Sequence, residues 1–185
     1  EVMGSRLCIK SQLNEGSTFW FDLPQPDLHS RRLVQSANKV TGYRGVTRRL
    51  LLGEGGVEVT GTLLPLLRRV GFEVLHVEDP DAFVKSCDLF QPDAVILDLY
   101  FAGGDGLQVM KEVETSYDRK KDAEMPPVIL FSDHRAADDR EKSLRAGAAG
   151  YVGTPIRFSD LLTALKEHLG LIYTEGEDET GVEQP

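Results

Sequence analysis

Apolar residues between positions 46 and 170 follow two recurring patterns. Continuous or nearly continuous apolar runs occur at 50–52, 72–77, 94–97, 128–131 and 150–152. Runs of this length are typical of strands buried on both faces, as in a parallel sheet covered by helices. Between the runs, apolar residues recur every three or four positions, which is typical of amphipathic helices. The sequence therefore predicts five strands that alternate with five helices.

Local signals support this alternation. Asp105 precedes a helical segment and is a candidate N-cap, and Pro80 is placed where a first helical turn tolerates proline. Strands that alternate with helices build a three-layer, doubly wound α/β fold with right-handed crossovers. The predicted fold class is therefore a five-stranded parallel sheet with helices on both faces.

The flanking segments have different patterns. Residues 1–24 alternate in two short stretches around a polar turn and end at Pro24, which predicts a β-hairpin. Residues 25–45 show no periodicity and are predicted to be a linker. Residues 171–185 are acidic with few apolar groups, and are predicted to be a disordered tail.

Composition narrows the function classes. Hydrophobic residues make up 41% of the 185 residues and charged residues 28%, which is typical of a globular protein. The net charge of −9 argues against a general nucleic-acid binder, and no apolar run approaches the roughly 18 to 20 residues of a bilayer span. The two cysteines, Cys8 and Cys87, form no metal-binding spacing, and a reducing cytoplasm is the expected location.

The buried run at 94–97 ends in a carboxylate, Asp98, and is followed by a glycine-rich loop. In open parallel sheets, functional sites form where the carboxyl ends of central strands meet. Asp98 is therefore the first candidate site residue.

With these features in place, residues 46–170 resemble a response-regulator receiver domain. The markers are Asp98 after an apolar run, Asp105-Gly106 at a helix start, Ser132 after the fourth strand, and the run at 146–151 before Pro155. Residues 1–24 resemble the closing strands of a histidine-kinase ATP-binding domain. This order resembles a hybrid histidine kinase, which implies a flavodoxin-like receiver with strand order 2-1-3-4-5. The portion present lacks what binds ATP, so the fragment itself is not expected to be a kinase, although its parent protein is.

The resemblance also implies a site. Asp98 matches the phosphoacceptor, Ser132 the hydroxyl that binds phosphoryl oxygens, and Tyr151 the aromatic switch residue. Glu54 matches the first acid of a Mg²⁺-binding pair, so Glu54 and Asp98 are expected to hold Mg²⁺ weakly at most.

Two positions depart from the family pattern. Gly55 stands where the second acid belongs and has no ligand atom in its side chain, and Thr154 stands where a lysine belongs. Loss of the lysine removes a charge-assisted contact to a phosphoryl group. The sequence therefore predicts weak or absent phosphorylation of Asp98.

Three functions remain open. The first is a regulatory interaction module that docks on the histidine kinase core or on a neighbouring receiver. The second is a phosphoacceptor that exchanges phosphoryl groups with a histidine phosphotransfer domain. The third is a sensor of a cyclic dinucleotide, with candidate residues Tyr151, Pro155, Arg157, Arg140 and Arg145. No nucleic acid and no membrane contact by this fragment are expected.

Overall fold

The computed structural model describes residues 8–12, 16–20, 39–54, 57–101, 104–120, 123–132, 138–153 and 156–176. Its centre is a parallel sheet of β4 (Arg49–Gly53), β5 (Glu73–Val77), β6 (Ala94–Asp98), β7 (Val128–Phe131) and β8 (Gly150–Val152). The strand order is β5-β4-β6-β7-β8, and all neighbouring pairs are parallel. This confirms the predicted doubly wound fold and the order 2-1-3-4-5.

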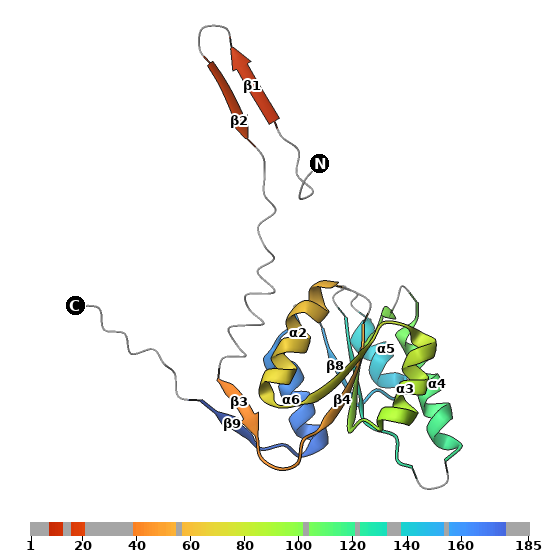
Figure 1. Ribbon diagram of the computed structural model, residues 1–185. Helices are drawn as coiled ribbons and strands as arrows, with labels where there is room; N and C mark the ends of the chain where they lie inside the picture. Colours follow the sequence, from red (N-terminus) through yellow and green to blue (C-terminus); the bar gives the residue numbers. More distant parts are fainter. Residues whose placement is uncertain are drawn as a thin grey trace, which may run out of the picture.

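Five helices connect and cover the strands (Figure 1). They are α2 (Val57–Val70), α3 (Pro80–Phe90), α4 (Gly106–Asp118), α5 (Asp139–Arg145) and α6 (Phe158–Leu169). The predicted cap of α4 is confirmed, since the Asp105 side chain accepts a hydrogen bond from Leu107 N at 2.9 Å. The Ala-rich segment predicts a fourth helix over about 136–146; the helix begins at Asp139, and residues 133–137 lie outside the described part.

The two faces of the sheet build two separate hydrophobic cores. Leu50, Leu52 and Ile96 face α2 and α6, whereas the alternate residues Leu51 and Val95 face α3 and α4. All five of these side chains are fully buried. Because successive strand residues point to opposite faces, an uninterrupted apolar run can supply both cores at once.

A second, two-stranded sheet joins the ends of this domain. Strand β3 (Val40–Tyr43) pairs antiparallel with β9 (Tyr173–Glu175), and we call residues 39–43 and 173–176 the clasp. Figure 1 shows the clasp at one corner of the domain, beside the lower ends of α2 and α6. β3 falls within the predicted linker at 25–45 and β9 within the predicted tail at 171–185. Strands of three or four residues carry too little pattern to be recognised when their partner is distant in sequence.

Two aromatic residues attach the clasp to the core. The Tyr43 ring stacks on Phe72 with 4.7 Å between ring centroids, and its hydroxyl accepts from Arg48 N at 2.8 Å and donates to Gly71 O at 3.2 Å. The Tyr173 hydroxyl donates to Leu162 O in α6 at 2.8 Å. The clasp is therefore part of the folded domain.

The predicted hairpin is also present as a strand pair. Strand β1 (Cys8–Gln12) pairs antiparallel with β2 (Gly16–Trp20), with Cys8 opposite Trp20 and Gln12 opposite Gly16. Gly16 has a φ of +99°, a conformation that glycine adopts without strain. Residues 13–15, within the turn region, lie outside the described part.

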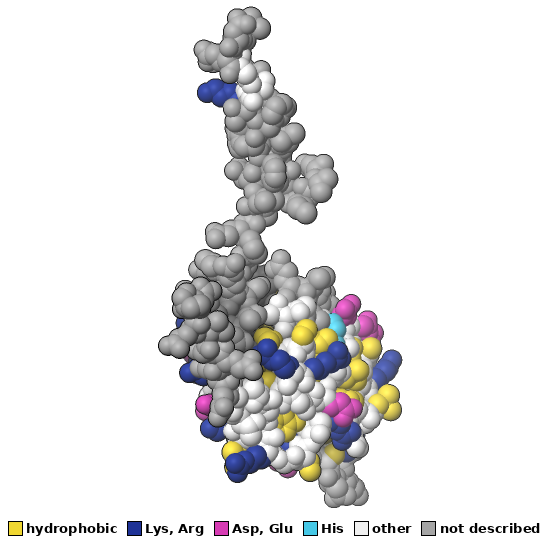
Figure 2. All heavy atoms as spheres, turned by 60° about the vertical axis from the view of Figure 1, so that its left-hand side comes forward, with side chains coloured by type: hydrophobic (Ala, Val, Ile, Leu, Met, Phe, Trp, Pro, Cys, Tyr) yellow, Lys and Arg dark blue, Asp and Glu magenta, His cyan; other side chains and the backbone are white. Residues whose placement is uncertain are grey.

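The surface of the described part is chemically mixed. On the face seen in Figure 2, hydrophobic, basic and acidic side chains are interspersed over the domain. Among the described helices, none is long and apolar enough to cross a membrane.

Candidate functional site

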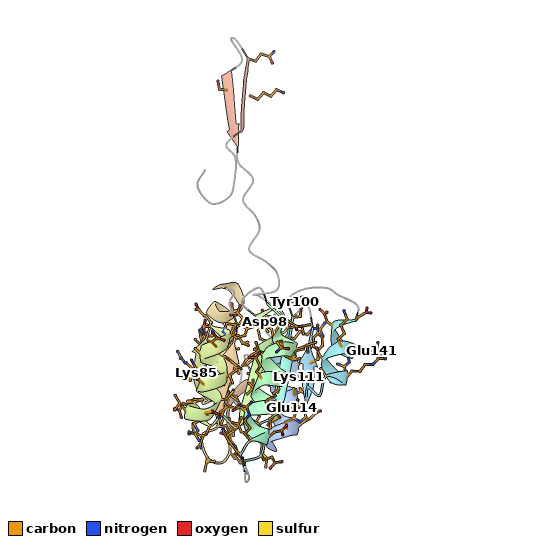
Figure 3. All side chains as sticks on the ribbon, turned by 90° about the vertical axis from the view of Figure 1, so that its right-hand side faces the viewer. Lys85, Asp98, Tyr100, Lys111, Glu114 and Glu141 are labelled. Atoms are coloured by element: carbon orange, nitrogen blue, oxygen red, sulfur yellow. The ribbon has the colours of Figure 1, made fainter. Side chains whose placement is uncertain are left out.

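Asp98 lies at the carboxyl end of β6, the central strand of the sheet. β6 is hydrogen-bonded to β4 on one side and β7 on the other, and its first four residues are fully buried while Asp98 is partly exposed. Figure 3 shows Asp98 and Tyr100 together at this end of the sheet, whereas Lys85 and Lys111 lie farther along α3 and α4. Asp98 is therefore accessible from the edge where the predicted site belongs.

The backbone that follows Asp98 lies close to the start of α4. Gly106 N donates to Leu99 O at 2.8 Å, and a Cβ on Gly106 would lie 2.2 Å from the Asp98 carbonyl oxygen. Only a residue without a side chain allows this approach, which explains the Asp-Gly pair at the helix start.

Ser132 follows β7 immediately and is fully buried. Asp98 is in register with Phe131, the residue before Ser132, so Asp98 and Ser132 lie at the ends of neighbouring strands. The Ser132 side chain interacts with Tyr151 of β8 and acts to lower its pKa. The structure thus links two of the residues that the sequence assigned to the site.

The Tyr151 ring lies close to the backbone that follows β8. A Cβ on Gly153 would lie 3.1 Å from the Tyr151 ring. Burial raises the pKa of Tyr151 most, and the negative charge of Asp139 raises it further, while the interaction with the Ser132 side chain acts in the opposite direction. The negative charge of nearby carboxylates therefore affects the pKa of the Tyr151 hydroxyl.

Two further residues belong to the site and were not found from the sequence. Tyr100 N donates to Asp98 Oδ1 at 2.9 Å, and the Tyr100 hydroxyl donates to Asp139 Oδ1 and Oδ2 at 3.2 and 3.4 Å. Asp139, the first residue of α5, is only 1% exposed. Its place in the sequence, beside Asp138 at a helix start, resembles that of an ordinary solvent-facing acid, so only the fold reveals its burial.

The surroundings of Tyr100 are acidic. The loss of hydration raises the pKa of Tyr100, and the hydrogen bond to Asp139 together with the negative charges of Asp139, Asp98 and Asp105 raises it further. The Tyr100 hydroxyl is thus hydrogen-bonded to one carboxylate, that of Asp139, and the charges of Asp98 and Asp105 also act on its pKa.

Glu54 follows β4 and is 2% exposed. Its N–H donates to Val77 O at 3.4 Å, and its carbonyl oxygen lies 3.0 Å from His76 Nε2. Within the described residues, no three His, Cys, Asp or Glu side chains come together as a metal site would require. Mg²⁺ in proteins is commonly held by one or two carboxylates, with water completing its near-octahedral shell, so weak binding by Glu54 and Asp98 stays a prediction.

The remaining predicted residues are dispersed. Thr154, Gly55 and Pro155 lie outside the described residues. Arg157 immediately precedes α6, while Arg140 and Arg145 lie on α5, where Arg145 is paired with Glu141. Binding of a cyclic dinucleotide by these residues and Tyr151 remains a prediction.

Known proteins share this architecture. Residues 58–166, more than half of the chain, match the response regulator receiver domain family. A solved two-component response regulator of the LuxR family from Aurantimonas superposes with a TM-score of 0.57 at 23% identity, over 68% of this chain and 86% of that chain. At this identity the likeness bears on the fold alone.

Two curated relatives match over a longer stretch. The sensor histidine kinase AruS of Pseudomonas aeruginosa is 26% identical over 167 residues, which cover 90% of this chain and 16% of AruS. The sensory/regulatory protein RpfC of Xanthomonas campestris pv. campestris is 24% identical over 191 residues, covering 90% of this chain and 26% of RpfC. The chain thus spans a small part of either relative. With the family match at 58–166, the parallel sheet in receiver order and Asp98 at the end of its central strand, the chain belongs to the response regulator receiver domain family.

Proposed function

We propose that this chain carries an atypical receiver domain of a hybrid histidine kinase, which acts mainly as a regulatory interaction module and is phosphorylated weakly or not at all at Asp98. Membership of two-component signal transduction follows from the family. The hybrid arrangement is supported by the matches to AruS and RpfC, which cover 90% of the chain and therefore extend beyond residues 58–166. The hairpin of β1 and β2 is accordingly proposed to be the end of a kinase ATP-binding domain.

The acidic surroundings of Tyr100 carry this proposal. A phosphoryl group on Asp98 would add negative charge where Asp98, Asp105 and Asp139 already act on one hydroxyl. Phosphoryl transfer depends on positive charge around the equatorial oxygens, and the position of the family's lysine is Thr154. Negative charges that act on the same site oppose the addition of a phosphoryl group there.

A phosphoacceptor receiver is the second candidate, because several parts of the site are in place. Asp98 ends the central strand, Ser132 follows its neighbour, and the Ser132 side chain interacts with Tyr151. If this arrangement suffices, the domain exchanges phosphoryl groups with a histidine phosphotransfer domain or the kinase core, and any Mg²⁺ is held weakly by Glu54 and Asp98.

The proposed partners follow from the interaction role. A histidine kinase core or a neighbouring receiver would dock on the face formed by α5, β8 and α6, where Leu144 of α5 is 41% exposed. A cytoplasmic location is proposed with this role. Binding of a cyclic dinucleotide near Tyr151 and Arg157 is kept as a prediction for calorimetric titration.

The experiment compares four proteins in Mg²⁺ and acetyl phosphate, with intact mass as the readout. They are the unaltered chain, Asp98→Asn, the double variant Gly55→Asp with Thr154→Lys, which restores the family's acid and lysine, and this double variant with Asp98→Asn added. We expect little or no added phosphoryl mass on the unaltered chain and a clear gain in the double variant.

The control decides which site is labelled. The gain must vanish when Asp98→Asn is added to the double variant. Efficient labelling of the unaltered chain that disappears in Asp98→Asn would overturn the proposal and establish the phosphoacceptor function.

A further inference from the structure

Tyr100 is bonded to the acceptor strand and to helix α5 at the same time. Its backbone N–H donates to Asp98 Oδ1 at 2.9 Å, and its side-chain hydroxyl donates to the carboxyl oxygens of Asp139 at 3.2 and 3.4 Å. One residue therefore connects the carboxylate at the end of β6 with the first turn of α5, 39 positions later in the chain.

The two ends of this connection differ in freedom. Asp139 is 1% exposed and lies in α5, where Ser143, one turn farther on, is also fully buried. The Tyr100 side chain is 38% exposed and belongs to the connection between β6 and α4. Asp139 is therefore the fixed end, and Tyr100 is the end whose position depends on the bond between them.

The backbone on either side of Tyr100 is fixed by hydrogen bonds of its own. Leu99 N donates to Phe131 O on one side, and Gly104 N donates to Phe101 O on the other. Between these two points, the Tyr100 N–H is directed at Asp98 Oδ1. The carbonyl of the same peptide, Leu99 O, accepts from Gly106 N at 2.8 Å, so this peptide is held from the start of α4. The bond between the Tyr100 hydroxyl and Asp139 is a further restraint on the residue that carries the N–H.

We propose that Asp139 and Tyr100 are positioning residues for the Asp98 carboxylate. Asp139 holds the Tyr100 hydroxyl, the ring holds the backbone, and the Tyr100 N–H fixes the orientation of Asp98. The same contacts also connect Asp98 to α5, so a chemical change at Asp98 Oδ1 would alter the position of α5 through Tyr100 and Asp139. This is a second route beside the interaction between Ser132 and Tyr151.

The inference rests on the proposed function only in taking Asp98 as the functional residue. It does not require Asp98 to be phosphorylated, because the contacts exist in the unmodified protein. A receiver without efficient phosphorylation would retain this link between its acceptor position and α5, part of its proposed docking face.

The test measures the Tyr100 amide and the Asp98 carboxyl by NMR in the unphosphorylated full chain. The amide reports by its hydrogen exchange rate, and the carboxyl by its ¹³Cγ signal, identified by its loss in Asp98→Asn. Tyr100→Phe removes only the hydroxyl. We expect Tyr100→Phe to speed exchange at position 100 about tenfold and to shift the Asp98 signal.

Variants of Asp139 separate positioning from general stability. Asp139→Asn keeps a carbonyl oxygen that can accept from Tyr100 and should preserve both readouts. Asp139→Leu has a similar size without an acceptor and should reproduce Tyr100→Phe. Tyr117→Phe is the matched control, because it removes a tyrosine hydroxyl at a different place. The Tyr117 hydroxyl donates to the backbone oxygen of Cys87 at 3.4 Å.

The outcomes are separable from the labelling experiment. Unchanged exchange at position 100 in Tyr100→Phe, or an equal change in Tyr117→Phe, would overturn the positioning role. Failure of acetyl phosphate to label the chain bears only on the proposed function, since the NMR experiment uses no phosphodonor.

Discussion

At the scale of single residues, the backbone at Asp98 and Leu99 packs closely against Gly106. A Cβ there would lie 2.2 Å from Asp98 O and 3.0 Å from Leu99 Cα, both of them backbone atoms that cannot rotate away. The geometry of Asp98 is therefore tied to a position that takes part in no chemistry.

We expect Gly106→Ala to lower the free energy of unfolding by about 2 kcal/mol or more, because α4 must move away from β6. Gly61→Ala is the matched control, since Gly61 lies in α2, a Cβ there would have no neighbouring atom within 4 Å, and alanine favours helix. Urea unfolding of both variants checks this. Equal stability of the two variants would contradict the packing argument.

Cys87 of α3 is fully buried. Burial, and to a smaller extent the charge of Asp88, raises the pKa of the Cys87 thiol to about 12. Since the thiolate is the reactive form, Cys87 should resist a thiol reagent at pH 8 in the native protein and react after denaturation. Titration of a Cys8→Ser variant, which leaves Cys87 as the single thiol, checks this, and rapid native labelling would contradict it.

The positions of residues at the ends of buried apolar runs could be predicted from the sequence, while the roles of these residues stay a prediction. Asp98 and Ser132 each stand at the end of a buried apolar run, and the structure puts them at neighbouring strand ends. Tyr100 and Asp139 could not be predicted, because their meeting depends on how α5 packs against the sheet. No local pattern distinguishes a buried acid at a helix start from an exposed one.

At the scale of elements, α3 and α4 are fastened together by a polar cluster. Asp88 of α3 accepts from Lys120 Nζ at 2.5 Å and from the Ser116 hydroxyl at 3.1 Å. The Lys120 ammonium also lies 4.3 Å from the centre of the Tyr117 ring. The hydrogen bond from Lys120, above all, lowers the pKa of Asp88.

Because its folded-state pKa is lowered, ionised Asp88 stabilises the fold above its ordinary pKa of 3.8, and this contribution is lost as the pH falls through the lowered value. The side chains of Lys120 and Asp88 are 37% and 44% exposed, so solvent screening limits the effect. We expect Asp88→Asn to cost less than about 1 kcal/mol at pH 7 and nothing at low pH. Thermal unfolding at several pH values, with exposed Asp118→Asn as control, tests this.

Most elements were predictable because each carries its own pattern. Strands β7 and β8 begin and end where the apolar runs do, and α4 begins after its predicted cap. β3 and β9 could not be predicted, since their separation in the chain leaves no signal in either neighbourhood; the Thr41 hydroxyl, for example, bonds to Thr174 O across 133 positions.

At the scale of the whole molecule, the clasp makes the domain larger than its five strands and five helices. Gly176 N donates to Lys39 O at 3.0 Å and Arg44 N donates to Ile172 O at 2.9 Å, so the clasp is bonded at both ends. Its strands pack on the core that α2 and α6 share with the sheet.

Removal of residues 173–185 should abolish the clasp and leave the parallel sheet folded. We expect the amides of β3 to lose protection in hydrogen exchange while those of β4 and β6 keep it, because a lone short strand has no partner for its ladder. Removal of 177–185 alone is the control and should leave β3 protected. Protection of β3 in the shorter chain would contradict its dependence on β9.

The clasp also determines how the domain responds to tension. Val40 stands opposite Glu175, so the chain enters and leaves at the same end of the strand pair. A pull between the preceding and following segments would peel the two strands apart one hydrogen bond at a time, starting at the bond between Gly176 and Lys39. Mechanical load would reach the five-stranded sheet only after the two strands had separated. The clasp would therefore yield first and protect the parallel sheet from unfolding under tension.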